Sequence, residues 1–248
     1  HPALIIVGLV GSIDNDMVGT DMTIGADTAL HRILDAIDQL TSTAASHQRT
    51  FVVEVMGRHC GYLPLMAAVA GGADYVFTPE DPVGQGWQDD LAEHLRLGRE
   101  AGRRESIVLV AEGAHDRDGN ELSTQLIADT IQERTGEDAR VTILGHVQRG
   151  GTPSAYDRWM STLLGYAAVQ EILASTGEDE PVILGVRRNR ITRVPLMKAV
   201  HDTRAVKDYI AAGDYAAAQA SRGSSFSSMV SIYHLLSTPP QLTPEPTG

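Results

Sequence analysis

Near its start the chain reads Leu4-Ile5-Ile6-Val7-Gly8-Leu9-Val10, an apolar run that leads directly into the acidic loop Gly11-Ser12-Ile13-Asp14-Asn15-Asp16. The run predicts a buried strand, so the loop would place the carboxylates of Asp14 and Asp16 just beyond that strand. In open parallel sheets, ligands bind at the carboxyl ends of the strands. Two neighbouring acids can divide the chemistry, one accepting a proton and the other working near a metal ion. The loop alone is explained better by an Asx-rich turn, and the rest of the chain overturns that interpretation.

Beyond this loop, strand-like runs alternate with helical periodicity, which predicts an α/β architecture. Strands are expected at residues 50–56, 75–77, 106–110 and 140–144, with a possible strand pair at 182–186 and 191–194. Helices are expected around 29–40, 62–70, 88–102, 122–135, 156–174, 197–210 and 215–222, the last two closing the folded part. We expect a folded unit over residues 1–236 and a proline-rich linker over 237–248, together a segment of a longer polypeptide.

The composition narrows the class of protein. The chain has 248 residues, a formal net charge of −12 and a single cysteine, Cys60. The negative charge argues against nucleic acid as a partner, because such binding depends on basic groups that neutralise phosphates. One cysteine excludes an internal disulfide framework and fits a reducing compartment. With no apolar run of membrane-spanning length and no leader-like segment, a cytoplasmic protein without a membrane partner is expected.

Polar side chains follow three further predicted strands. Arg58 comes after the strand at 50–56, Glu112 after 106–110, and His146 with Arg149 after 140–144. If the sheet is parallel, these groups and the acidic loop converge on one edge, which argues for a catalytic site. Arginine suits a phosphate ligand because its planar fork donates two parallel hydrogen bonds. Taken singly, each group has a plainer interpretation: a solvated arginine, or a histidine that caps a strand end.

Four motifs with this order and spacing resemble ATP-dependent 6-phosphofructokinase, specifically the amino-terminal catalytic half of the duplicated eukaryotic enzyme. They are Gly11–Asp16 with Gly19-Thr20-Asp21, then Ser46-His47-Gln48-Arg49, Met56-Gly57-Arg58-His59-Cys60-Gly61-Tyr62 and Gly145-His146-Val147-Gln148-Arg149-Gly150-Gly151. The resemblance implies the phosphofructokinase-like fold, with mostly parallel sheets flanked by helices and two lobes with the site between them. It also implies a glycolytic, allosteric enzyme that phosphorylates the 1-hydroxyl of fructose 6-phosphate to give fructose 1,6-bisphosphate.

The resemblance assigns roles to the acidic loop. Asp14 matches the general base that takes the proton from the sugar 1-hydroxyl, and Ser12 and Ile13 match neighbours that line the same pocket. Asp16 matches the second acid, near the magnesium ion. Gly11 stands where pyrophosphate-dependent relatives carry a lysine, so the resemblance favours ATP as the co-substrate.

Roles for the remaining loops come from the same resemblance. Met56, Gly57 and Arg58 match the loop that contacts fructose 6-phosphate, with Arg58 also facing the transferring phosphoryl group. Glu112 matches the acid that hydrogen-bonds the sugar. The sugar's 6-phosphate is held, in the family, by the segment that matches His146, Val147, Gln148 and Arg149.

Two arginines imply an oligomer. Arg49 and Arg140 match arginines that the family supplies to the substrate across a subunit contact, in a homo- or hetero-oligomer. The family's glycine-rich nucleotide loops, with the main magnesium-binding acid, would lie upstream of this sequence, so we expect the chain alone to lack kinase activity.

Three other functions stay open at this point. A regulatory half could bind a sugar phosphate as a signal, although the intact Asp14 and Asp16 argue against it. A metal-dependent phosphatase using Asp14, Asp16, Glu112 and His146 would usually need more metal ligands close in sequence. The chain on its own could also act only as a sugar-phosphate-binding module.

Overall fold

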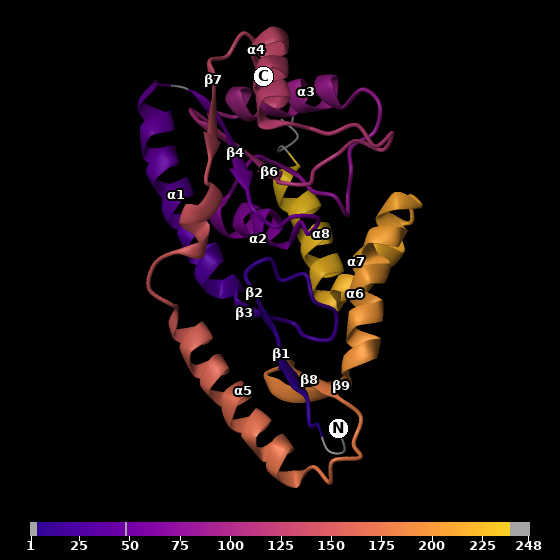
Figure 1. The fold of residues 1–248 in the computed structure, drawn as a ribbon. Helices are drawn as coiled ribbons and strands as arrows, with labels where there is room; N and C mark the ends of the chain where they lie inside the picture. The colour runs from indigo at the N-terminus through magenta and orange to yellow at the C-terminus, as the bar shows by residue number, and fades with distance from the viewer. Residues whose placement is uncertain (1–3, 48, 239–248) are drawn as a thin grey trace, which may run out of the picture.

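The computed structural model describes residues 4–47 and 49–238 of the chain (Figure 1). The strands are β1 (Val7–Leu9), β2 (Gly11–Ser12), β3 (Ile24–Gly25), β4 (Thr50–Val55), β5 (Tyr75–Phe77), β6 (Ser106–Ala111), β7 (Ala139–Ile143), β8 (Val182–Arg187) and β9 (Arg190–Pro195). The helices are α1 (Ala26–His47), α2 (Tyr62–Gly71), α3 (Trp87–Glu100), α4 (Thr124–Thr135), α5 (Ala155–Ala174), α6 (Leu196–Ala211), α7 (Tyr215–Arg222) and α8 (Ser224–Ser237), with a 3-10 turn, η1 (Gly145–Arg149).

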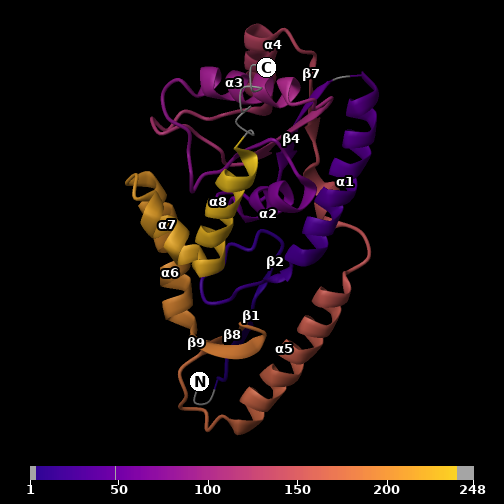
Figure 2. The same cartoon turned by 180° about the vertical axis from the view of Figure 1, so that it is seen from behind.

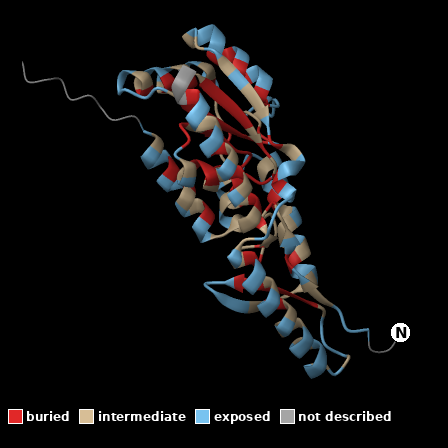
Figure 3. Ribbon diagram, turned by 90° about the vertical axis from the view of Figure 1, so that its left-hand side faces the viewer, coloured by how far each residue is buried: buried red, intermediate tan, exposed pale blue. Residues whose placement is uncertain are grey.

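A four-stranded sheet of order β5-β6-β4-β7 forms the centre of the first lobe, and its strands are all parallel. Alternate residues of a strand face opposite sides of a sheet, so both faces of β4 are apolar. Phe51, Val53 and Val55 pack with α1, α2 and α8, whereas Val52 packs on the other side with α3 and α4. Figure 3 shows buried ribbon concentrated in this lobe.

A three-stranded sheet of order β1-β8-β9 lies in the second lobe, with β1 parallel to β8 and β8 antiparallel to β9. The long helix α5 covers it through Met160 and Leu164, which pack against Ile183 and Leu184. Between the lobes lies a pair of very short parallel strands, β2 and β3. The expected α/β fold with two lobes is confirmed, and so is the strand pair at 182–186 and 191–194.

One prediction about the end of the folded part was wrong. A further helix, α8, follows α7, and it lies against α2 on the same face of the four-stranded sheet (Figure 2). Its Phe226, Val230 and Tyr233 are buried, at a helical spacing that the serine-rich surroundings obscure. Residues 239–248 of the expected linker lie outside the described residues. Within the ranges that the structure describes, no helix has the length and apolarity needed to cross a membrane.

Candidate active site

Three of the predicted site segments lie together at the carboxyl edge of the four-stranded sheet. Met56, Gly57 and Arg58 follow β4, Glu112 follows β6, and η1 follows β7, as expected for parallel strands. The Glu112 carboxylate joins two of these segments, because its Oε2 accepts hydrogen bonds from the backbone N–H of Arg58 at 2.9 Å and of Gly57 at 3.3 Å.

The backbone around Arg58 is tightly confined. Arg58 has a φ of +52° and Gly57 a φ of +153°, both in the region that side chains rarely adopt. A Cβ on Gly113 would lie 2.3 Å from the Arg58 carbonyl oxygen, so glycine is required directly after Glu112. The local sequence therefore dictates an exposed loop that aims the Arg58 side chain outward, with 70% of that side chain exposed.

The acidic loop reaches this site from elsewhere. It follows β1 and begins with β2, which belong to other sheets, so the expectation that all four strand ends share one sheet edge was wrong. The reason is that β1 pairs with β8 and β2 with β3, and neither hydrogen-bonds to the four-stranded sheet. The candidate site is thus built from two sheets, and its two halves meet where Asp14 Oδ2 lies 3.8 Å from Arg58 Nε.

The acidic loop is closed locally by a serine rather than by an Asx side chain, while Asn15 bonds to the distant Thr23. Asn15 has a φ of +53°, and its Oδ1 accepts a hydrogen bond from the backbone N–H of Thr23 at 2.7 Å. The Ser12 hydroxyl accepts from the Asp14 N–H at 3.2 Å and donates to Asp16 Oδ1 at 2.9 Å. Asp14 is different, because its Oδ1 is buried and has no hydrogen-bond partner among the described residues. Ser12 and Asn15 therefore fix the loop and leave one oxygen of Asp14 without a hydrogen-bond partner among the described residues.

The surroundings of Asp14 favour its protonated form. Burial raises the pKa of Asp14 above the ordinary value of 3.8, and the charges of Asp16 and Glu112 raise it further. Arg58 and Arg149 act in the opposite direction without cancelling the rise. A carboxylate with a raised pKa, one oxygen without a hydrogen-bond partner and an arginine beside it is equipped to accept a proton.

The turn η1 presents part of the predicted phosphate-binding segment. His146, Val147 and Arg149 are exposed, whereas Gln148 is buried. Gln148 Oε1 accepts a hydrogen bond from the Met56 N–H at 3.2 Å, and its Nε2 donates to the Gly145 carbonyl at 3.1 Å. The Gln148 side chain therefore braces η1 against the Met56 loop.

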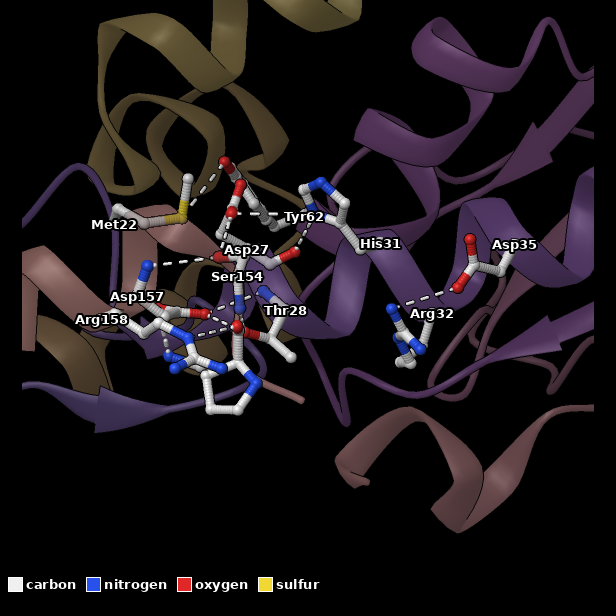
Figure 4. A network of polar contacts seen from close by, with 12 residues as sticks. Met22, Asp27, Thr28, His31, Arg32, Asp35, Tyr62, Ser154, Asp157 and Arg158 are labelled. Atoms are coloured by element: carbon white, nitrogen blue, oxygen red, sulfur yellow. Dashed lines mark hydrogen bonds and ion pairs between the residues drawn. The ribbon is translucent and has the colours of Figure 1, made fainter. Parts of the chain in front are cut away.

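A partly buried network, not evident from the sequence, holds the start of α5 to the start of α1 (Figure 4). Asp157 Oδ1 accepts from the Gly25 N–H, and Oδ2 accepts from the Thr28 N–H, both at 2.8 Å. The Thr28 hydroxyl donates to Asp157 and accepts from the Ser154 N–H at 3.0 Å. Gly25 pairs with Ser12 in the β2–β3 ladder, so this network connects the acidic loop to the helix that follows η1.

Two predicted substrate arginines lie away from this site. Arg49 precedes β4 and Arg140 is the second residue of β7, so both are at the amino ends of strands whose carboxyl ends carry the site. Both bind the same carboxylate, Asp138, at 2.9 Å. The structure thus brings Arg49 and Arg140 together but separates them from Asp14. Gln48, from the same motif as Arg49, lies outside the described residues.

The fit of a divalent cation can be judged from the available carboxylates. Over residues 4–47 and 49–238, no group of three or more His, Cys, Asp or Glu side chains is placed to hold a metal ion. The carboxylate of Asp16 is still suitable for magnesium, which often takes one or two protein carboxylates together with substrate phosphates and water.

Comparison with known proteins gives a consistent result. The phosphofructokinase family model matches residues 2–172. The chain is 50% identical over 232 residues to the liver-type ATP-dependent 6-phosphofructokinase of Bos taurus, covering 94% of this chain and 30% of the relative. It is 51% identical over 240 residues to the ATP-dependent 6-phosphofructokinase of Aspergillus niger, covering 96% and 31%. The chain therefore spans about a third of the length of these relatives.

Solved structures agree. A phosphofructokinase from Saccharomyces cerevisiae superposes with a TM-score of 0.91 at 46% identity, covering 93% of this chain and 30% of the yeast chain. A pyrophosphate-dependent phosphofructokinase from Marinobacter aquaeolei superposes with a TM-score of 0.67 at 22% identity, covering 78% of this chain and 52% of the other. At that identity the second likeness concerns the fold alone.

Proposed function

The chain belongs to the phosphofructokinase family, and from this premise we propose that the protein transfers a phosphoryl group from ATP to the 1-hydroxyl of fructose 6-phosphate, giving fructose 1,6-bisphosphate in glycolysis. The observation that carries the proposal is the pairing of Asp14 with Arg58, 3.8 Å apart and supplied by two different sheets. Relatives that share about half of their aligned residues with this chain are named ATP-dependent 6-phosphofructokinases.

In the proposed reaction Asp14 is the general base. Its carboxylate, whose Oδ1 has no partner among the described residues, accepts the proton of the sugar 1-hydroxyl while the hydroxyl oxygen attacks the terminal phosphorus of ATP, the bond to the β-phosphate breaks and ADP leaves. Phosphoryl transfer demands mainly positioning and neutralisation of charge, so the exposed Arg58 guanidinium stabilises the transferring group. Magnesium, when bound with ATP, would neutralise phosphate charge, and Asp16 is the residue of this loop proposed to approach it.

The sugar phosphate is proposed to bind between the two lobes. Exposed His146, Val147 and Arg149 would contact the 6-phosphate, with Gln148 holding that segment in place from below. Contacts to the sugar itself are proposed for Ser12, Ile13, Met56, Gly57 and Glu112. Of the two carboxylate oxygens of Glu112, Oε2 accepts the hydrogen bonds from Gly57 and Arg58. Oε1 has no hydrogen-bond partner among the described residues and is left for a sugar hydroxyl.

Arg49 and Arg140 are proposed to serve a neighbouring subunit in a homo- or hetero-oligomer. Their place at the far end of the four-stranded sheet, with Asp138, supports this role because they cannot serve the site of their own chain. We further propose that the 248 residues by themselves do not catalyse the transfer. A cytoplasmic location is proposed from the single cysteine.

The test is phosphorylation of fructose 6-phosphate by the intact polypeptide that carries this chain, with fructose 1,6-bisphosphate measured directly. Asp14→Asn should lower kcat by about 10²- to 10⁴-fold, the usual contribution of a general base. Asp35→Asn, which neutralises an exposed aspartate on α1, is the matched control and should leave kcat unchanged. Binding of fructose 6-phosphate without phosphoryl transfer would instead indicate a sugar-phosphate-binding protein. Release of phosphate without ATP would indicate a phosphatase.

A further inference from the structure

The last residue of α7, Arg222, contacts the backbone of both loops of the candidate site. Its side chain is only 7% exposed. Nη1 donates to the carbonyl oxygen of Asp16 at 2.9 Å, and Nη2 donates to the carbonyl oxygen of His59, also at 2.9 Å. Asp16 follows Asp14 by two residues and His59 follows Arg58 directly. One guanidinium therefore holds the loop of the proposed base against the loop of the proposed phosphoryl-binding arginine.

A second buried group fixes the guanidinium. Arg222 Nε donates at 2.9 Å to Oε1 of Glu80, whose side chain is fully buried. The other carboxylate oxygen, Oε2, accepts from the Gly61 N–H at 2.8 Å, so Glu80 also binds the Arg58 loop. A Cβ on Gly61 would lie 2.7 Å from that oxygen, which shows how closely the loop approaches the carboxylate.

The arrangement depends on the shape of arginine. Its planar fork directs several N–H groups in fixed directions, so Nε, Nη1 and Nη2 can each bind a different partner at once. The three partners here come from the acidic loop, the Arg58 loop and the segment after β5. Because the two site loops arise from sheets that share no hydrogen bonds, contacts of this kind determine the distance between Asp14 and Arg58.

We propose that Arg222 is a positioning residue for phosphoryl transfer, which sets the distance between Asp14 and Arg58 by binding the backbones of both loops. The proposal rests on the proposed function of Asp14 and Arg58. Arg222 does not contact the reacting atoms in this scheme, and its effect reaches them through the carbonyls of Asp16 and His59. Displacement of reacting groups by about 1 Å can lower the rate by up to about 100-fold.

A purely structural role makes a different prediction. If Arg222 serves only to neutralise the buried charge of Glu80, then removing both charges together should restore everything that removal of the arginine destroys. The double variant Arg222→Met with Glu80→Gln separates the two roles. A glutamine amide oxygen can still accept from the Gly61 N–H, whereas methionine leaves the carbonyls of Asp16 and His59 without their shared donor.

The experiment compares Arg222→Met, Arg222→Lys and the double variant in the intact polypeptide, by thermal unfolding and by kcat and KM for each substrate. Arg222→Met should have a lower Tm and a lower kcat than the wild type. The double variant should regain most of the Tm, yet its kcat should stay about tenfold or more below wild type, with a smaller change in either KM. Lysine keeps the positive charge but lacks the planar fork of arginine. Arg222→Lys should therefore have a Tm close to that of the wild type and a clearly lower kcat.

Arg117→Met is the matched control, because Arg117 also donates to a backbone carbonyl, that of Pro82, at a place outside the candidate site. It should leave kcat unchanged. A double variant with the wild-type kcat would overturn the proposal.

Hydrogen exchange supplies a readout that needs no activity. In the double variant, amide exchange should accelerate in residues 14–16 and 57–61 together, and Arg117→Met should change neither segment. Unchanged exchange in both segments would overturn the proposal even if the intact polypeptide had no kinase activity. If the wild type were inactive but the double variant still showed faster exchange in both segments, the result would count against the proposed function alone.

Discussion

At the scale of single residues, Asp14 combines two properties that usually exclude each other. It is buried, which favours the neutral acid, and it is proposed to work as an ionised base. Arg58 and Arg149 partly offset the effect of burial on the Asp14 pKa, while Asp16 and Glu112 add to it. Acids with pKa values shifted in this direction are common where proton transfer takes place, because a base works best when its pKa lies near the working pH.

The raised pKa of Asp14 predicts how activity and stability depend on pH. The rate should fall on the acidic side with an apparent pKa above the ordinary 3.8 of an aspartate, as measured from kcat/KM against pH. Because the folded pKa exceeds the unfolded one, protonated Asp14 stabilises the fold at low pH, and this contribution disappears as the pH rises through the folded pKa.

Asp14→Asn should therefore leave Tm at neutral pH equal to or above that of the wild type, although it lowers kcat. The ion pair that it loses is weak, because the Arg58 side chain is 70% exposed. A large fall in Tm at pH 7 would contradict this account of the site.

Sequence alone could indicate the residues that follow strands and could not indicate those that act across the fold. Arg58 and Glu112 each follow an apolar run, so their convergence follows from the shared direction of β4 and β6, whereas the approach of Asp14 depends on how other sheets pack. Arg222 binds Asp16 over a separation of 206 residues, and Asp157 binds Gly25 over 132, and no local pattern signals either contact. Their roles depend on packing that only the folded chain reveals.

At the scale of elements, α8 shows why the end of the fold was not predicted. The helix has no side-chain cap at its start, and its serines are poor signals of a helix interior. It is fixed instead by tertiary contacts, among them a hydrogen bond at 2.8 Å between the Val76 N–H and the hydroxyl of Tyr233. Val76 lies on β5, at the edge of the four-stranded sheet, so α8 supplies a partner for a strand that has a neighbour on one side only.

Tyr233→Phe should destabilise the chain by about 1–3 kcal/mol, because it leaves the buried N–H of Val76 without a partner. The measurement is the free energy of unfolding in denaturant, with Tyr209→Phe on the exposed side of α6 as the control. Equal stability of the two variants would show that α8 holds to the sheet through apolar packing alone.

At the scale of the whole molecule, the second lobe leaves much apolar surface exposed. The outer side of α5 carries large exposed side chains along its whole length: Trp159, Leu163, Tyr166, Val169 and Leu173. Figure 3 shows this helix largely in the colour of exposed residues. Contiguous apolar surface of this kind usually marks contact with other protein. The relatives are about three times as long as the aligned region, so in them further parts of the polypeptide are available to cover such a surface.

We expect these 248 residues, when isolated, to self-associate through α5. Leu163→Glu should shift the chain toward the monomer in analytical ultracentrifugation. The control is Leu126→Glu on α4, because the two leucines are equally exposed, at 46% and 45%. The same effect from both substitutions would point to a general influence of charge rather than to the α5 face.

The position of Cys60 allows the opening of the two site loops to be measured through the reactivity of one thiol. It is the chain's only cysteine, fully buried, and its Sγ lies 3.8 Å from the Asn15 carbonyl oxygen, where the two site loops touch. Burial raises the pKa of this thiol, so it is unreactive while the loops are closed. Its rate of alkylation by iodoacetamide should therefore depend on how often the acidic loop and the Arg58 loop separate. Fructose 6-phosphate should slow that alkylation. Rapid, complete labelling without substrate would mean that the resting site spends much of its time open.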